Sequence, residues 1–150
     1  MRASLKKLAD EERIGDMRIL FVTIEGNAVA EMAEQYAIGT QSEHGKVGQG
    51  RSLLALWPET GRTPMEQVDM MGHLVDAVTE DDSSLLCVLS ASPYVLRALQ
   101  VAAAEHGVAT HVECVLIQLD GSPNAIEATE SLYDAWVRPF ERLEARECNL

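Results

Sequence analysis

The chain has 150 residues, of which 47% are hydrophobic, which suits a single domain with a sizeable core. Lysine and arginine number 12 against 24 aspartate and glutamate residues, a formal net charge of −12, which argues against nucleic acid or an anionic membrane as a partner. No run approaches about 18 apolar residues, so the sequence predicts neither a membrane span nor a signal peptide. Three cysteines without metal-type spacing suit a reducing compartment, and we expect a cytoplasmic protein.

The first 16 residues form a separate part of the predicted organisation. Ser4 is a candidate N-cap, and Leu5, Leu8 and Ile14 fall on one side of a short amphipathic helix. We therefore divide the chain into an N-terminal helical extension, 1–16, and a single α/β domain, 17–150. The extension is interpreted either as a solvated arm or as an arm that packs or dimerises.

Arg18 to Ile24 reads as a buried strand of a parallel sheet, because its β-rich apolar run lacks polar alternation. A short Gly-Asn turn follows, and then a helix from Ala28 to Ala37 that is expected to end at Gly39. A strand that feeds a helix through a few residues aims unpaired backbone N–H groups at one point beyond the sheet. Many α/β proteins hold an anion at such a point.

Four glycines mark Gly39 to Arg51 as the one long loop of the prediction. The segment departs in spacing from the nucleotide-binding glycine-lysine motif, and it follows a predicted helix where that motif follows a strand, so we reject it as a phosphate cradle. His44, Lys46 and Arg51 make it locally basic. It is interpreted as a mobile connector, with a ligand-binding loop as the alternative.

The remaining elements alternate between strand and helix. Strands are predicted at Ser52 to Trp57, Leu85 to Ser90 and Val112 to Leu119, and helices from Thr63-Pro64, from Ser92-Pro93 to Ala104, and from about Ala125 to Arg146. This order predicts a three-layer αβα domain with a four-stranded parallel sheet and right-handed crossovers.

The stretch RILFVTIEGNAVAEMAE, residues 18–34, resembles the signature of the low-molecular-weight protein tyrosine phosphatases and the arsenate reductases of the same fold. Two triplets match that signature in the right register: Leu20, Phe21, Val22 and Met32, Ala33, Glu34. The resemblance implies a doubly wound, flavodoxin-like sheet. It places the family's nucleophilic cysteine on Thr23, its phosphate-binding arginine on Val29 and the following serine on Ala30.

The resemblance extends more weakly over the rest of the chain, where LDGSPNAIEATESLYDAW resembles the general-acid loop and last helix of the family. The acidic residue of that loop falls on Ser122, although Asp120 lies two positions away. Cleavage of a phosphate ester in this family needs a thiolate, an arginine and an aspartic acid. All three are replaced, so the chain is interpreted as a degenerate member that lacks the reaction.

The predicted ligand-binding turn comprises eight residues: Thr23, Ile24, Glu25, Gly26, Asn27, Ala28, Val29 and Ala30. Glu25 and Glu31 would repel a dianion there, and we expect Glu25 to fold back onto the N–H groups of the turn. No metal or cofactor is expected.

The function predicted is that of a pseudoenzyme, a binding, regulatory or assembly module. Its expected partner is another protein or a second copy of the chain, as in a homodimer. The alternative is an enzyme of altered chemistry that uses Thr23, Asp120 or the His44 loop in the same crevice, or residual phosphatase or arsenate reductase activity.

Overall fold

The computed structural model describes residues 17–46, 51–80, 85–126 and 141–148. Their central feature is a sheet of five strands in the order β2-β3-β1-β4-β5. The strands are β1 (Arg18–Ile24), β2 (Ser52–Leu56), β3 (Leu85–Leu89), β4 (Val112–Ile117) and β5 (Pro123–Ile126). Three helices connect them, α2 (Ala30–Lys46), α3 (Pro64–Glu80) and α4 (Pro93–Glu105), and the short 3-10 helix η1 (Ala109–His111) leads into β4. Residues 141–148 are also helical.

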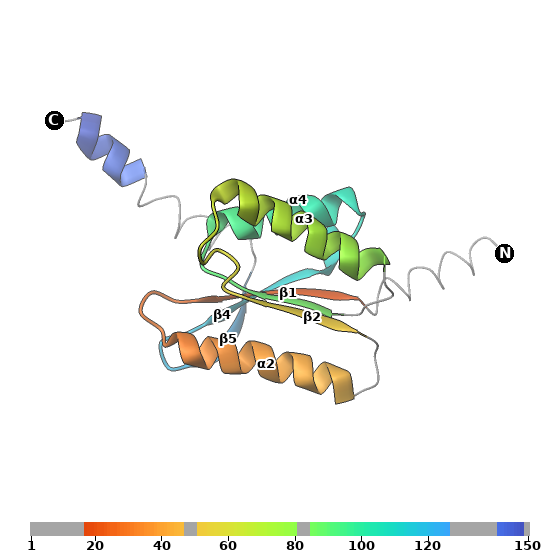
Figure 1. The fold of residues 1–150 in the computed structure, drawn as a ribbon. Coiled ribbons are helices and arrows are strands. Elements are labelled where there is room, and N and C mark those ends of the chain that lie inside the picture. Colours follow the sequence, from red (N-terminus) through yellow and green to blue (C-terminus); the bar gives the residue numbers. More distant parts are fainter. Residues whose placement is uncertain (1–16, 47–50, 81–84, 127–140, 149–150) are drawn as a thin grey trace.

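The helices cover both faces of the sheet. Figure 1 shows α2 on one face and α3 with α4 on the other. The first four strands are parallel, so their carboxyl ends meet at one edge, on the left of Figure 1. The α/β class and the three layers are confirmed.

The sheet differs from the predicted four-stranded parallel arrangement because β5 pairs with β4 antiparallel. The sequence predicts a loop and a final helix from Pro123 onward, whereas Gly121 has a φ of +86° and reverses the chain into a hairpin. Residues 127–140, where most of that helix was predicted, lie outside the described residues. The strand order also places β3 between β2 and β1, while the flavodoxin-like order places β1 between the second and third strands.

A second correction concerns Gly39. Helix α2 continues through Gly39 to Lys46, so the predicted long loop is largely helical. A glycine ends a helix effectively when its backbone becomes left-handed, and Gly39 keeps a negative φ. The Thr40 hydroxyl donates to the Tyr36 carbonyl at 2.9 Å one turn earlier, and the helix-forming residues Gln41 and Glu43 follow.

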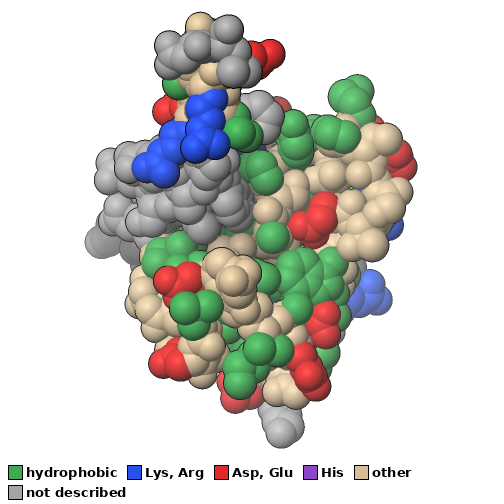
Figure 2. Space-filling model, turned by 90° about the vertical axis from the view of Figure 1, so that its left-hand side faces the viewer, with side chains coloured by type: hydrophobic (Ala, Val, Ile, Leu, Met, Phe, Trp, Pro, Cys, Tyr) green, Lys and Arg blue, Asp and Glu red, His purple; other side chains and the backbone are tan. Residues whose placement is uncertain are grey.

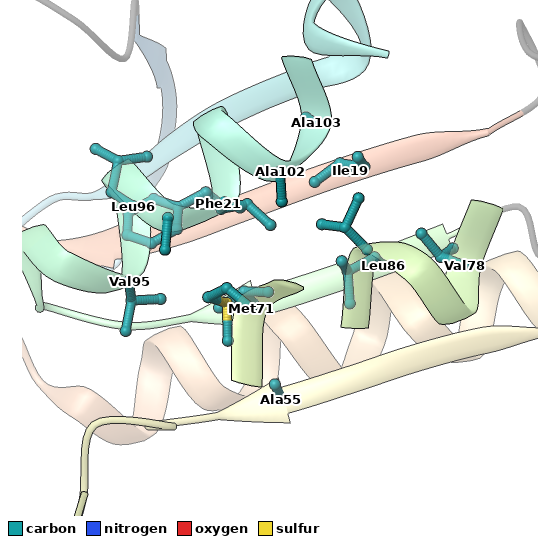
Figure 3. Packing of buried hydrophobic residues seen from close by; sticks show 14 of the residues in the cluster. Ile19, Phe21, Ala55, Met71, Val78, Leu86, Val95, Leu96, Ala102 and Ala103 are labelled. Atoms are coloured by element: carbon teal, nitrogen blue, oxygen red, sulfur yellow. The ribbon is translucent and has the colours of Figure 1, made fainter. Parts of the chain in front are cut away.

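The core has two layers because successive side chains of a strand point to opposite faces. Ile19 and Phe21 of β1 face α3 and α4, where they pack in one cluster with Met71 and Ala102 (Figure 3). Leu20 and Val22 of β1 point to the other face, where they pack on the small residues Ala33 and Ala37 of α2. β1 is thus buried on both faces, as its continuous apolar run predicts.

Local capping explains where α3 and α4 begin. Thr63 and Glu66 form a reciprocal capping box, in which each backbone N–H donates to the other side chain at 3.3 and 3.2 Å. The Ser92 hydroxyl caps α4 by accepting from the Val95 N–H, and Pro93 occupies the first turn. These caps place both helix N-termini at the carboxyl edge of the sheet.

Candidate functional site at the carboxyl edge of the sheet

The turn between β1 and α2 lies where the topology of the sheet opens a crevice. β1 and β3 are neighbours, but the chain leaves β1 toward α2 on one face and leaves β3 toward α4 on the other. In open α/β sheets, ligands bind beyond the strand ends at such a divergence. The eight residues that the sequence singles out therefore do lie at this edge.

The backbone of the turn is partly occupied by the protein itself. The Glu25 N–H donates to the Ile117 carbonyl at 2.9 Å, and the Ala28 N–H donates to the Glu25 carbonyl at 2.8 Å. Gly26 has a φ of +45°, which a glycine adopts without strain. At the start of α2 the Met32 N–H donates to the Val29 carbonyl at 3.1 Å. An anion at this turn would have fewer N–H groups available than the strand-to-helix pattern predicts.

The expected closure of the turn by Glu25 is not observed. The Glu25 side chain is exposed and makes no hydrogen bond or ion pair among the described residues. Glu31, in the first turn of α2, is exposed as well. Both carboxylates therefore add negative charge to the surface of the turn, and hydration by bulk water favours this outcome over a contact with backbone N–H groups.

Thr23 is fully buried, and its hydroxyl has no hydrogen-bond partner among the described residues. It pairs with Leu116 of β4 and lies two residues beyond Phe21, so its side chain points toward α3 and α4. The turn that would hold a substrate leads to α2, on the opposite face. Thr23 therefore does not present its hydroxyl to the turn.

A hydrogen-bonded polar cluster lies at the ends of β2 and β3, and the sequence reasoning missed it. Glu59 Oε2 accepts from the Ser90 hydroxyl at 2.7 Å and from the Ala91 N–H at 2.9 Å. The Ser92 hydroxyl donates to Gln67 Oε1 at 2.6 Å. The signal for this cluster is the run of polar residues directly after two apolar strands. Its contacts tie the N-termini of α3 and α4 to the sheet.

Asp120 lies in the turn between β4 and β5 and is bonded to Ser122. Asp120 Oδ1 accepts from the Ser122 hydroxyl at 2.6 Å and from its N–H at 2.9 Å. These bonds from Ser122 hold the pKa of Asp120 below its usual range. Asp120 is therefore a deprotonated turn residue near neutral pH, and a general acid must be protonated to act.

The two turns together form what we call the carboxyl-end patch. It contains the exposed apolar side chains Val29, Met32 and Leu119 and the exposed carboxylates Glu25, Glu31 and Asp120. Figure 2 looks onto this end of the molecule and shows hydrophobic and acidic side chains intermingled over the lower part of the view, with Lys and Arg side chains near the top and at the right-hand edge. A surface of this composition repels a dianion and leaves apolar area in contact with water.

The cysteines offer no nucleophile at this edge. Burial raises the pKa values of the Cys87 and Cys114 thiols to about 12, although Arg18 opposes the shift at Cys87. Cys148 is exposed, in the helix at 141–148. In the described part of the chain no group of three or more metal-ligating side chains lies together. Among the same residues no helix is long and apolar enough to cross a membrane.

No family model, curated protein or solved structure matches the chain.

Proposed function

We propose that the protein is a non-catalytic binding module of phosphatase-like origin, and that it binds a protein partner or a second copy of itself at the carboxyl-end patch. The observation that carries the proposal is the state of Thr23, whose hydroxyl is buried and without a partner at the position of the family's nucleophile. The strand order departs from the flavodoxin-like one. The proposal therefore relies on the resemblance only for the segment that comprises β1, the turn and α2.

The environment of Thr23 argues against a nucleophile of altered chemistry. A threonine hydroxyl needs an adjacent base to attack a phosphorus or carbonyl centre. No base is hydrogen-bonded to the Thr23 hydroxyl among the described residues. A cysteine at this fully buried position would meet a related obstacle, because burial disfavours the thiolate. A thiol that stays protonated is neither a nucleophile nor a metal ligand.

The other two groups of the phosphatase reaction lack counterparts as well. Val29 is 53% exposed and has no donor for the equatorial oxygens of a phosphoryl group. Asp120, held ionised by Ser122, has no proton for a leaving group. The alternative of a modified enzyme at this edge therefore gains no support from Thr23 or Asp120.

The surface itself supports binding of a macromolecule. Val29, Met32 and Leu119 are 53%, 44% and 63% exposed; Val29 and Leu119 lie on the two turns, and Met32 lies at the start of α2, next to Gly121 of the second turn. Aliphatic side chains gathered on one end of a protein favour contact with another protein. Methionine adapts its shape to a partner more readily than branched side chains do.

Turnover assays test the loss of catalysis. The full chain is incubated with p-nitrophenyl phosphate, and separately with arsenate and a thiol reductant, beside a Thr23→Val variant. We expect rates at the level of buffer for both proteins. Turnover that the Thr23→Val substitution abolishes would contradict the proposal, while turnover unchanged in the variant would indicate a contaminating enzyme and call for repurification before the comparison is repeated.

A further inference from the structure

The carboxyl-end patch has the charge and the apolar character to receive the most basic segment of the same sequence. The patch is one continuous surface, because the Glu25 N–H bonds to Ile117 at the start of the second turn. The second turn also touches the start of α2 at Gly121, where an added Cβ would lie 2.5 Å from Met32 Sδ. Val29, Met32 and Leu119 therefore belong to one site on the molecule.

The charge of the patch has one sign. Glu25, Glu31 and Asp120 are exposed, and neither residues 19–45 nor residues 112–126 contain a lysine or arginine. The bonds from Ser122 keep Asp120 ionised. Three carboxylates around exposed aliphatic side chains select a partner that carries cations beside apolar residues.

The sequence holds one segment of that kind. Residues 2–8, RASLKKL, combine Arg2, Lys6 and Lys7 with Leu5 and Leu8 and contain no acidic residue. Outside residues 1–8, no stretch of seven residues in this chain has three cations. In a protein with a formal net charge of −12, this segment is complementary in both charge and hydrophobicity to the carboxyl-end patch.

We propose that residues 2–8 of one copy bind the carboxyl-end patch of a second copy, with the exchange reciprocated. This inference rests on the proposed binding function and names its partner. Two identical contacts related by a two-fold axis close the assembly as a dimer.

The geometry favours a second copy over the same chain. Met17 precedes β1, at the end of the sheet opposite the patch. The seven residues of β1 span about 23 Å. Residues 9–16 reach at most about 29 Å when fully extended. If residues 2–8 bound the patch of their own chain, residues 9–16 would have to run nearly straight along the whole domain. Binding to the patch of a second copy does not require this extended path.

Charge-swap variants of the full chain test the proposal by sedimentation equilibrium. The first variant is Lys6→Glu with Lys7→Glu, the second is Glu25→Lys with Glu31→Lys, and the third combines all four substitutions. Far-UV circular dichroism verifies that each variant is folded. We expect the wild type to dimerise and each two-residue variant to raise the dissociation constant about tenfold or more. The four-residue variant should recover most of the loss because the attractive pairs are re-formed.

The apolar part of the contact is tested by Leu119→Ser, with Ile38→Ser as the matched control. Both side chains are exposed, at 63% and 44%, but Ile38 lies on α2 outside the patch. We expect Leu119→Ser alone to weaken the dimer.

Three results would overturn the inference. They are a wild type that stays monomeric at all concentrations, a dimer indifferent to the charge reversals, and a four-residue variant no tighter than the two-residue ones. A monomer whose melting temperature follows the charge swap would place the contact within one chain and overturn the exchange between copies. The turnover assays are independent of these results. A protein that does not dimerise as proposed is therefore distinguished from a protein that is catalytically active.

Discussion

Replacing Thr23 by valine should stabilise the protein, although the residue replaced is polar and lies in a functional position of the resembled family. The Thr23 hydroxyl is buried and has no hydrogen-bond partner among the described residues. Such a group forfeits its hydrogen bonds to water on folding, at a cost of about 1–3 kcal/mol. Valine has nearly the same shape and favours a strand as threonine does.

The expected gain for Thr23→Val is about 1–2 kcal/mol, the lower part of that range, because local rearrangement offsets some of the penalty. For a chain of this size it corresponds to a rise in melting temperature of about 2–8 °C. Urea and thermal unfolding followed by circular dichroism measure both quantities.

Thr79→Val is the matched control for this measurement. The Thr79 hydroxyl is partly buried and bonded, at 2.9 Å to the Val75 carbonyl and at 3.0 Å to the Asp76 carbonyl. Its loss should leave stability unchanged or lower it by about 1 kcal/mol. A Thr23→Val variant less stable than the wild type by about 1 kcal/mol or more, the value of one hydrogen bond, would refute the reasoning and mean that the hydroxyl has a partner in solution.

Three further predictions concern pH, thiol reactivity and capping. The bond from His106 to the Ala102 carbonyl, with the adjacent Asp76, raises the pKa of His106 above 6.5, so the stabilisation from protonated His106 is fully present below pH 6.5 and is lost as pH rises through the folded-state pKa. The melting temperatures of the wild type and His106→Ala should therefore differ most near pH 5.5 and converge by pH 8.5. A difference that grows with pH would contradict this. In the native protein a thiol reagent at pH 8 should label Cys148 alone, with the two buried cysteines reacting only in denaturant; rapid labelling of more than one thiol would be inconsistent with their burial. Ser92→Ala should lower the free energy of unfolding by about 1–3 kcal/mol because it removes the cap of α4 and the bond to Gln67. Ser42→Ala, at an exposed position, serves as the control. Equal stabilities of the two variants would mean that the cap contributes nothing.

Local signals in the sequence predict the parts of the fold that depend on a few neighbouring residues. β1 has the predicted bounds, since an uninterrupted apolar run permits burial on both faces. α3 and α4 begin at Pro64 and Pro93, directly after the expected Thr63 and Ser92. In each case the capping group lies within three residues of the N–H that it satisfies.

The features that failed depend on contacts between distant parts of the chain. Gly39 is an effective helix stop only with left-handed backbone, and packing of α2 on the sheet keeps it helical. β5 is a strand because β4 has a free edge to pair with, which the short segment Pro123–Ile126 does not reveal by itself. Strand order is likewise a property of the assembled sheet.

The candidate site shows the same division. The sequence locates the turn after β1, because an apolar run followed by a Gly-Asn turn and a helical pattern is read position by position. It does not reveal that the Thr23 hydroxyl faces away from the turn, since that follows from the register of β1 and the layers around it. It also leaves Glu59 and Ser90 unconnected, because their bond joins residues 31 positions apart.

The central claim, that the carboxyl edge has become a protein-binding surface with no anion site, is tested most directly by titrating the full chain with vanadate in an isothermal calorimeter. We expect no saturable binding up to millimolar concentration, since Glu25 and Glu31 are exposed at the turn and part of its backbone is already bonded. Saturable binding with a micromolar dissociation constant that is lost on Gly26→Pro would contradict it.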